Sequence, residues 1–422
     1  MSVYAPIKVP SDSLILSIDS FSDKSYAGQP TTNLGGSVHL GFTGERWAKT
    51  TDYPNKGVLP FNLGTDVYRL ASGNNYWGYA SDFSFQYNKT YTLSFWYWVN
   101  TTENIIWNNS VFGTPSAGGS AYNTVSTKST DTFVTTNNTN GWVFGYVTFS
   151  TNISVSSYSY FRGTFTGAGT DSTPTGNVYI ANFQLEEKSY PTQYTSGTRS
   201  NTQGMRDLTN NYTIDLTNAS FSTNAKPYFS ESLNSSIMTT LPMSSLPALS
   251  NFSLSIWFKP TAYPTVAPSN QYGSVTRAGV LFGATYYAGA ALYWYGNSSG
   301  NVMTIYGYIR GLDGYRNTSG YNLTLNQYHH LVLVHSYTDT KMRLYVNGSM
   351  YSEVQGATAS YDSNNMATAG NIGIGKAQVD GGGTQNYSYP SGHADLASVY
   401  TKALSSSEIL TMYDANRKRY GL

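Results

Sequence analysis

The sequence predicts an all-β protein: two β-sandwich (jelly-roll) domains with a short C-terminal helix. Runs of alternating apolar and polar residues, rich in Tyr, Thr, Val and Phe, recur between turns of Gly, Asn and Ser, which is the pattern of half-buried strands. Helical spacing of apolar residues is convincing only near the C-terminus. At 422 residues the chain is also long for a single core, so more than one domain is expected.

The composition restricts the classes of function. Charged residues make up 11% of the chain, against about 25% in typical globular domains. Aromatic residues make up 15%, which excludes a disordered chain. The net charge of +1 gives no electrostatic case for binding nucleic acid or an anionic membrane.

The chain contains no cysteine, which excludes disulfides, thiolate metal sites and a cysteine nucleophile. This absence fits a protein that is assembled in a bacterial cytoplasm. The N-terminus lacks the basic and apolar segments of a signal peptide, and no window approaches the roughly 20 apolar residues of a membrane span. We therefore expect neither nucleic-acid binding nor membrane insertion.

Residues 1–35 are expected to form an N-terminal arm with a first strand at Leu14–Asp19. Residues 36–199 are expected to form the first sandwich, because strand-like runs follow one another there at the spacing typical of that architecture. The runs are Tyr91–Val99, Trp142–Ser150, Tyr158–Phe165 and Val178–Leu185. A polar, turn-rich stretch at 200–204 is predicted as a linker.

Residues 205–422 are expected to form the second sandwich. Its strand-like runs are Phe252–Pro260, His329–Ser336, Lys341–Gly348, Ile372–Gly375 and His393–Tyr400. Within the third run, Asn347 and Gly348 predict a type I′ hairpin turn, which needs positive φ at both central residues.

The C-terminal helix is predicted from its start signal and its apolar stripe. Ser405 is the expected N-cap, and Glu408 three residues later completes a capping box. Ile409, Met412 and Tyr413 then fall at i, i+3 and i+4, which places them on one face of the helix.

The order of these elements resembles concanavalin A-like, laminin G-like jelly rolls. Segments that match in order are FSLSIWFKP, HHLVLVHS, KMRLYVNG, IGIG and HADLASVY. The helix that follows has the AL-S-x-x-E-I-x-x-x-Y pattern that closes such domains. The resemblance implies the fold of residues 205–422 but no particular ligand, because this fold hosts enzymes, lectins and structural modules alike.

The ends of the chain carry a second resemblance. The opening string SLILSIDSFSDKSYAGQPTTNL and the ending RKRYGL are similar to those of lectin-like structural proteins of tailed bacteriophages, cyanophages among them. In those proteins the opening runs directly into a stretch that occurs here only at Arg206–Phe221. Residues 36–199 are therefore interpreted as an insert, and its strand order resembles carbohydrate-binding-module jelly rolls of the galactose-binding-like type.

These resemblances imply a structural protein of a phage virion surface, made in the host bacterial cytoplasm. Such a protein decorates the capsid, neck or tail, or forms a fibre, and contacts host or environmental glycans. The implied partners are other virion proteins, further copies of the chain in a homo-oligomer such as a trimer, and a polysaccharide. The alternative is a receptor-binding, lectin-like tail fibre or adhesin that recognises cell-surface polysaccharide.

We expect the chain not to be an enzyme. Glycosidases of concanavalin A-like fold place acids alternately along one strand, as E-x-D-x-E, and this string is absent. Glu186 and Glu187 are adjacent, so they point to opposite faces if the strand continues through both. A zinc site at His329, His330 and His335 has no acidic or cysteine ligand nearby in the sequence, which favours structural histidines.

Exposed aromatic residues are the remaining route to function, because sugar rings stack on Trp and Tyr. The candidate glycan contacts are Tyr76, Trp77, Tyr79, Tyr293 and Trp294. Aromatic residues in alternating strands equally suit a sandwich core or an interface between subunits. Both alternatives stay open from the sequence.

No motif requires a cofactor. Jelly rolls of both kinds often bind a structural Ca²⁺ through Asp side chains and loop carbonyls. The candidate metal ligands are Asp215, Asp380 and Asp395, and no EF-hand pattern supports them.

Overall fold

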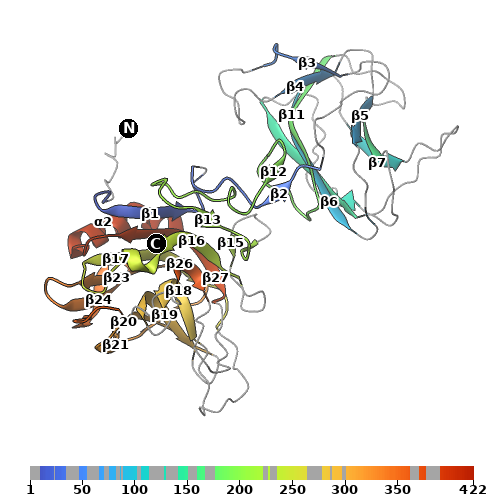
Figure 1. Ribbon diagram of the computed structural model, residues 1–422. Coiled ribbons are helices and arrows are strands. Elements are labelled where there is room, and N and C mark those ends of the chain that lie inside the picture. The colour runs from blue at the N-terminus through green and yellow to red at the C-terminus, as the bar shows by residue number, and fades with distance from the viewer. Residues whose placement is uncertain are drawn as a thin grey trace. The chain divides into compact units, whose positions relative to one another are not determined.

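The computed structural model describes residues 10–22, 24–34, 47–54, 66–70, 76–81, 86, 89–101, 106–113, 128–129, 141–150, 159–166, 176–221, 227–228, 235–263, 278–285, 288–296, 301–361, 370–376 and 390–422. This part of the chain is mostly β-strand with one short α-helix near its end (Figure 1), which confirms the predicted all-β class. Among these residues, no helix is long and apolar enough to cross a membrane.

The chain divides into two units. Met1–Pro30 and Ser200–Leu422 form the first, which we call the C-terminal unit, and Thr31–Arg199 form the second, the inserted unit. The stretch predicted as a linker belongs to the C-terminal unit. Its last residue, Gly204, is buried, and the Gly204 carbonyl accepts hydrogen bonds from the backbone N–H groups of Ala27 and Gly28.

Two antiparallel sheets build the C-terminal unit (Figure 1). The first sheet has the order β1 (Leu14–Asp19), β27 (Gly392–Tyr400), β17 (Phe252–Pro260), β23 (His329–Ser336), β24 (Lys341–Val346) and β25 (Ser349–Gln355). The second has the order β13 (Ile214–Asp215), β16 (Ile237–Pro242), β26 (Asn371–Lys376), β18 (Ala278–Thr285), β19 (Gly289–Gly296), β20 (Met303–Gly311) and β21 (Gly314–Asn317), and β22 (Tyr321–Asn322) also pairs with β20.

Shorter elements complete this unit. They are the strand pair β14 (Ser220–Phe221) and β15 (Pro227–Tyr228), the 3-10 helices η2 (Met243–Ser245) and η3 (Arg417–Tyr420), and the α-helix α2 (Ser406–Asn416). The hairpin between β24 and β25 turns at Asn347 and Gly348, whose φ values of 50° and 81° confirm the predicted positive-φ turn.

The main hydrophobic core lies between the two sheets. Strand alternation places Leu254 and Ile256 of β17 in it, together with Leu292 and Trp294 of β19 from the opposite sheet. Each of these side chains is fully buried. Burying a side chain of this kind contributes roughly 1.5–3 kcal/mol to the stability of the fold. The core contacts therefore hold β19 in place, together with the residues on its other face.

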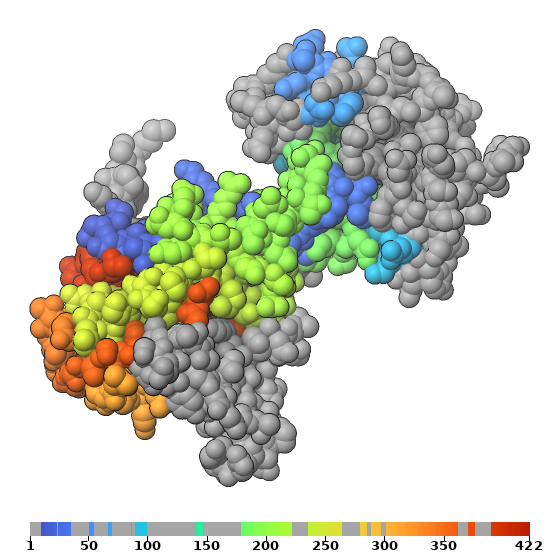
Figure 2. Space-filling view, viewed as in Figure 1, coloured from blue at the N-terminus to red at the C-terminus, as the bar shows by residue number. Residues whose placement is uncertain are grey.

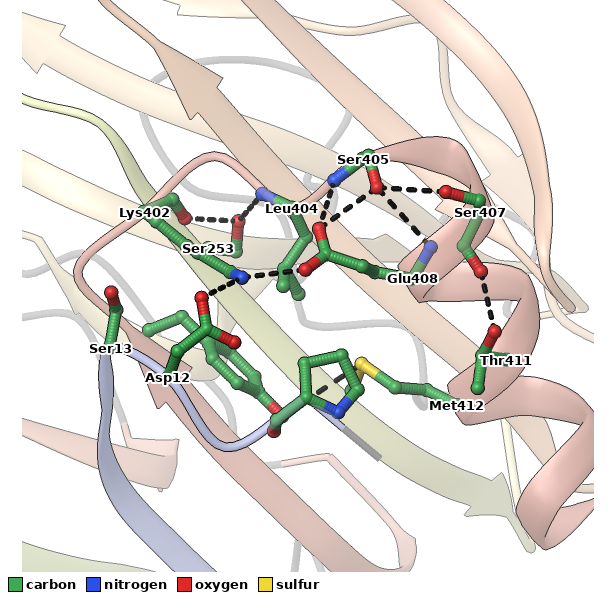
Figure 3. Close-up of polar contacts among 12 residues, drawn as sticks. Asp12, Ser13, Ser253, Lys402, Leu404, Ser405, Ser407, Glu408, Thr411 and Met412 are labelled. Atoms are coloured by element: carbon green, nitrogen blue, oxygen red, sulfur yellow. Dashed lines mark hydrogen bonds and ion pairs between the residues drawn. The ribbon is translucent and has the colours of Figure 1, made fainter. Parts of the chain in front are cut away.

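Helix α2 covers the outer face of the first sheet. Ile409 and Met412 pack there against Val332, Val334 and Tyr400, as the apolar stripe predicts. The capping box is also confirmed. The N–H of Ser405 donates to the Glu408 carboxylate at 2.8 Å, and the hydroxyl of Ser405 accepts from the Glu408 N–H at 3.3 Å (Figure 3).

The first strand of the chain closes one edge of the same sheet. Strand β1 pairs antiparallel with β27, so the beginning and the end of the chain lie side by side, blue against red in Figure 2. Lys402 fixes the approach to this strand, because its ammonium group forms ion pairs with both Asp12 and Glu408 (Figure 3). Farther along, the N–H of Ser17 in β1 donates to the buried carboxylate of Asp207 at 2.9 Å.

Two larger sheets also build the inserted unit. One has the order β3 (Trp47–Thr50), β4 (Val67–Leu70), β11 (Gly176–Glu186), β6 (Thr90–Thr101), β9 (Val143–Ser150) and β8 (Lys128–Ser129). The other has the order β5 (Tyr76–Ser81), β10 (Ser159–Thr166) and β7 (Ile106–Gly113), and β12 (Thr198–Arg199) pairs with β2 (Thr31–Thr32) in a sheet of two short strands.

One face of β6 and β11 carries a hydrophobic core of the inserted unit. Tyr91, Leu93 and Phe95 alternate along β6 and are almost completely buried. The ring of Phe95 stacks on that of Phe183 in β11, with 5.8 Å between the ring centroids. The intervening residues of β6 point to the other face of the sheet.

Candidate glycan-binding site

The outer face of the second sheet in the C-terminal unit carries a group of four tyrosines. Tyr293 and Tyr295 alternate with the core residues Leu292 and Trp294 along β19, so they point away from the core. Tyr306 and Tyr308 occupy the equivalent positions of β20. Tyr293 is directly opposite Tyr306 in the register of the two strands. We call these four residues the tyrosine face.

The rings of the tyrosine face contact one another across the two strands. Ring centroids lie 5.0 Å apart for Tyr293 and Tyr295, 5.5 Å for Tyr293 and Tyr308, and 5.3 Å for Tyr295 and Tyr306. These separations are those of interacting aromatic pairs. The rings therefore hold one another in place and form a fixed surface.

Exposure differs among the members of this face. Tyr293 is only 5% exposed and lies at the base, whereas Tyr295 and Tyr306 are half-buried. Tyr315 on the neighbouring strand β21 is 63% exposed and stands at the rim. Burial raises the pKa of Tyr295, and the nearby hydroxyls of Tyr308 and Tyr306 add to the shift. The Tyr295 hydroxyl therefore stays protonated and remains available as a donor.

Gly320 leaves room for one of these rings. A Cβ at this position would lie 2.5 Å from the Cζ atom of Tyr306, closer than two carbon atoms can approach. Glycine at this position thus allows the Tyr306 ring to approach the backbone that precedes β22 closely.

The structure separates the two aromatic candidates in β19. Tyr293 belongs to the tyrosine face, but Trp294 is 0% exposed and packs in the core between the sheets. A sugar ring cannot reach the Trp294 indole, so the core alternative applies to that residue. The other candidates, Tyr76, Trp77 and Tyr79, lie on β5, which pairs with β10, and their side chains are outside the described residues.

Sequence reasoning missed Tyr306 and Tyr308 as members of the candidate site. The signal was present in the segment MTIYGYIRG of β20, where tyrosines alternate with isoleucines and glycine. Alternation alone gives two faces without saying which one is the core, and the pairing of β20 with β19 settles that question.

The two candidate calcium ligands that the structure describes, Asp215 and Asp395, have separate hydrogen-bond partners. The Asp215 carboxylate accepts hydrogen bonds from the N–H and the hydroxyl of Thr217, Asp380 is outside the described residues, and Asp395 is buried in β27. Ser20 donates to Asp395. Burial and the Asp395 carboxylate together raise the pKa of Tyr328, which therefore donates to Asp395 as a neutral phenol. Within the described ranges, no three metal-ligating side chains come together.

The three histidines of β23 each have a separate structural environment. His330 is buried, stacks on Trp257 at a ring separation of 4.9 Å, and shares a hydrogen bond of 3.0 Å with the hydroxyl of Ser255. Burial lowers the pKa of His330 to about 3, so its ring is neutral. Nδ1 of His335 lies 2.9 Å from the carbonyl of Ser250, and Nε2 of His329 accepts from the N–H of Thr324 at 3.1 Å.

The adjacent acids in the inserted unit also point apart. Glu186 is buried and accepts hydrogen bonds from Thr31 and from Thr192, whereas Glu187 is exposed and forms an ion pair with Lys89 at 2.6 Å. The two carboxylates face different surroundings, because β11 ends at Glu186 and Glu187 lies just beyond the strand.

Comparison with known proteins agrees with the fold of the C-terminal unit. The sequence profile described as the Concanavalin A-like lectin/glucanases superfamily (Laminin_G_3) matches residues 233–410. No curated protein matches the sequence.

Solved structures resemble the chain weakly. The receptor binding domain of botulinum neurotoxin D has 13% identity and a TM-score of 0.36, with coverage of 52% of this chain and 51% of that one. A Trypanosoma rangeli sialidase has 16% identity and a TM-score of 0.34, with coverage of 51% and 31%. The chain thus spans about half the length of the toxin domains that it matches, and at these scores the likeness carries no argument about function. The profile match and the two-sheet architecture together show that the C-terminal unit contains a concanavalin A-like, laminin G-like domain.

Proposed function

We propose that the chain binds glycans through the tyrosine face of its C-terminal unit. The observation that supports this proposal is the cross-strand group of Tyr293, Tyr295, Tyr306 and Tyr308 on the outer face of a lectin-like sandwich. A pyranose ring has an apolar C–H face that stacks on an aromatic ring and hydroxyls that bond to polar groups at the edge. Phenol rings supply both kinds of contact.

The surroundings of the face suit an extended ligand. The rings of Tyr295 and Tyr306 are half-buried, so each presents part of its surface while its position stays fixed. The exposed ring of Tyr315 extends the aromatic surface beyond β20. Fixed aromatic side chains contribute contact area at low entropic cost, since few rotamers are lost on binding.

Binding without turnover is part of this proposal. The adjacent carboxylates that could suggest a glycosidase, Glu186 and Glu187, are held by Thr192 and Lys89 respectively and face apart. General acid and base groups of glycosidases face each other across the scissile bond.

The setting that we propose for this binding is the surface of a tailed-phage virion, where the chain acts as a structural component of the capsid, neck or tail together with other virion proteins and further copies of itself. Its support is the likeness of the opening string, of Arg206–Phe221 and of the ending RKRYGL to lectin-like virion proteins. Immunogold electron microscopy of purified particles, with antibody against the chain, tests this setting. Label on the head, collar or tail supports it, and unlabelled particles contradict it.

Glycan-array screening of the full chain tests the binding itself. We expect retention of at least one class of polysaccharide, and the same array probed with the double variant Tyr295→Ala, Tyr306→Ala should lose that signal. Tyr337→Ala is the matched control, because Tyr337 is an exposed tyrosine in the turn between β23 and β24. If the double variant retained every array signal of the native chain, the tyrosine face would be removed as a binding site.

A further inference from the structure

The inserted unit carries an aromatic face of its own. Trp96 and Trp98 of β6 alternate with the core residues Phe95 and Tyr97, so they point to the side of the sheet away from the core. In the register of the sheet, Trp96 is opposite Phe144 of β9. We call Trp96, Trp98, Trp142 and Phe144 the tryptophan face.

Contacts hold these rings in place. The ring centroids of Trp96 and Phe144 lie 5.4 Å apart, and those of Trp98 and Trp142 lie 6.2 Å apart. The indole N–H of Trp142 donates to the carbonyl of Pro54 at 3.3 Å, and Tyr53 packs edge-on against the same indole. Beneath them lie the buried side chains of a small cluster, namely Val67, Tyr179 and Ala181.

Part of this side of the sheet is covered by the chain itself. Gln184 and Glu186 lie farther along β11 and are fully buried. The N–H of Thr192 donates to Glu186, and the N–H of Thr195 donates to the side-chain oxygen of Gln184. Beyond this covered half, Phe144 is 38% exposed, and the three indoles are half-buried.

A positive charge borders the tryptophan face. Trp98 is opposite Tyr179, and Tyr179 is opposite Arg69 of β4, so the three residues form one row across the sheet on the same side. Arg69 is exposed. The other charged side chain that the register places on this side, Glu186, is buried at the covered end.

We propose that the tryptophan face binds an acidic polysaccharide, one that contains uronic acid residues. The indole rings of Trp96 and Trp98 stack on the apolar face of the pyranose ring, and the guanidinium of Arg69 binds the sugar carboxylate. Charge complementarity selects this occupant, because a planar guanidinium matches a carboxylate with two parallel hydrogen bonds. This site lies in a different unit from the tyrosine face and does not depend on the function proposed for it.

Tryptophan fluorescence of the full chain tests the inference. The chain carries Tyr295→Ala and Tyr306→Ala, so that the tyrosine face cannot contribute to binding. We expect titration with alginate, a soluble polymer of uronic acids, to shift the emission, because the ligand displaces water from the indoles. Dextran, a neutral glucan, should bind at least tenfold more weakly. Trp98→Ala should abolish the alginate response.

A charge variant keeps the test independent of folding. Arg69→Gln removes an exposed charge and should weaken alginate binding about tenfold, with the greatest difference at low salt because exposed charges are screened. Lys89→Gln is the matched control, since Lys89 is an exposed cation at the other end of β6. Absence of an alginate response, or a response that is unchanged by Arg69→Gln and by Trp98→Ala, overturns the inference.

The outcomes separate this inference from the proposed function. Loss of array binding with the tyrosine variants, together with no alginate response, supports the tyrosine face alone. The tryptophan face alone is supported if the alginate response depends on Trp98 and Arg69 and array binding is unchanged by the tyrosine substitutions.

Discussion

Arg419, near the end of the chain, forms a two-pronged ion pair with Asp19, the last residue of β1. One guanidinium nitrogen, Nη1, lies 2.8 Å from Oδ2 of the carboxylate, and Nη2 contacts Oδ1. The two residues are 400 positions apart in the sequence. The same turn of η3 places Tyr420 on Trp257, with 4.3 Å between ring centroids. The ending RKRYGL is thus part of the fold, and it fastens the first strand to the last helix.

Arg419→Gln should destabilise the C-terminal unit by about 1–3 kcal/mol, because it leaves the mostly buried carboxylate of Asp19 without its cation. Urea denaturation measures the change in the free energy of unfolding. Arg417→Gln is the matched control, because Arg417 pairs with Asp414 at a more exposed site. That variant should cost less than about 0.5 kcal/mol. Equal effects of the two substitutions would contradict a special role for the Arg419 pair.

Tyr420→Ala and Tyr420→Phe should have very different effects. Removing the ring takes away the stack on Trp257 and the contact with Tyr328, and we expect a loss of about 3 kcal/mol. The Tyr420 hydroxyl is buried and has no hydrogen-bond partner among the described residues, so Tyr420→Phe should be neutral or slightly stabilising. Thermal unfolding of the two variants checks this, and a large loss with Phe would show that the hydroxyl has a partner.

Asp207→Asn tests a second attachment of β1, the hydrogen bond between the Ser17 N–H and the Asp207 carboxylate. The carboxylate accepts hydrogen bonds from the N–H groups of Ser17, Thr209, Asn211 and Tyr212. An amide replaces one acceptor oxygen with a donor, so we expect a cost of about 1–3 kcal/mol in urea denaturation. Asp215→Asn is the control, since the Asp215 carboxylate accepts only from Thr217 in the contacts described. A larger effect at Asp215 than at Asp207 would contradict this account.

The stability of the C-terminal unit should fall as the pH is lowered from about 6.5. Burial lowers the pKa of His330 to about 3 and also lowers the pKa values of His329 and His335. Below the unfolded pKa of about 6.5, the unfolded chain binds protons that the folded chain excludes, so protonation favours unfolding. Each such histidine contributes a slope of at most about 1.4 kcal/mol per pH unit.

His330→Gln checks the sign of this pH dependence. The variant should be less stable than the native chain at pH 7, because it loses the stack on Trp257, but its stability should fall less steeply between pH 6.5 and pH 4. His393→Gln is the control, since His393 lies half-buried on β27 outside the three-histidine strand. A slope that is unchanged by His330→Gln would mean that His330 is not the group that titrates.

Local sequence signals predicted the elements better than they predicted the site. The bounds of β17 and β23 agree with the strand-like runs, and the capping box at Ser405 and Glu408 begins the helix as expected. These features depend on neighbouring residues, so a single sequence contains them. Whether Trp294 is a core residue or a surface residue depended on which face of β19 meets the opposite sheet. Pairing of β19 with β18 and β20 sets that face, and the local sequence does not show it.

The same reasoning explains the contacts that the sequence did not predict. Arg419 and Asp19 meet because β1 pairs with β27 across almost the whole length of the chain. Likewise, the row of Arg69, Tyr179 and Trp98 exists only in the register of three strands. The sequence left aromatic residues as core, interface or glycan contacts, and only the register shows which of them share a face.

The most direct measurement of the central claim is the affinity of the full chain for the glycan that it retains on the array, determined by isothermal titration calorimetry alongside Tyr306→Ala and Tyr337→Ala. We expect Tyr306→Ala to weaken binding about tenfold, which corresponds to about 1.4 kcal/mol, while Tyr337→Ala leaves the affinity unchanged. Equal affinity of all three proteins would contradict glycan binding by the tyrosine face.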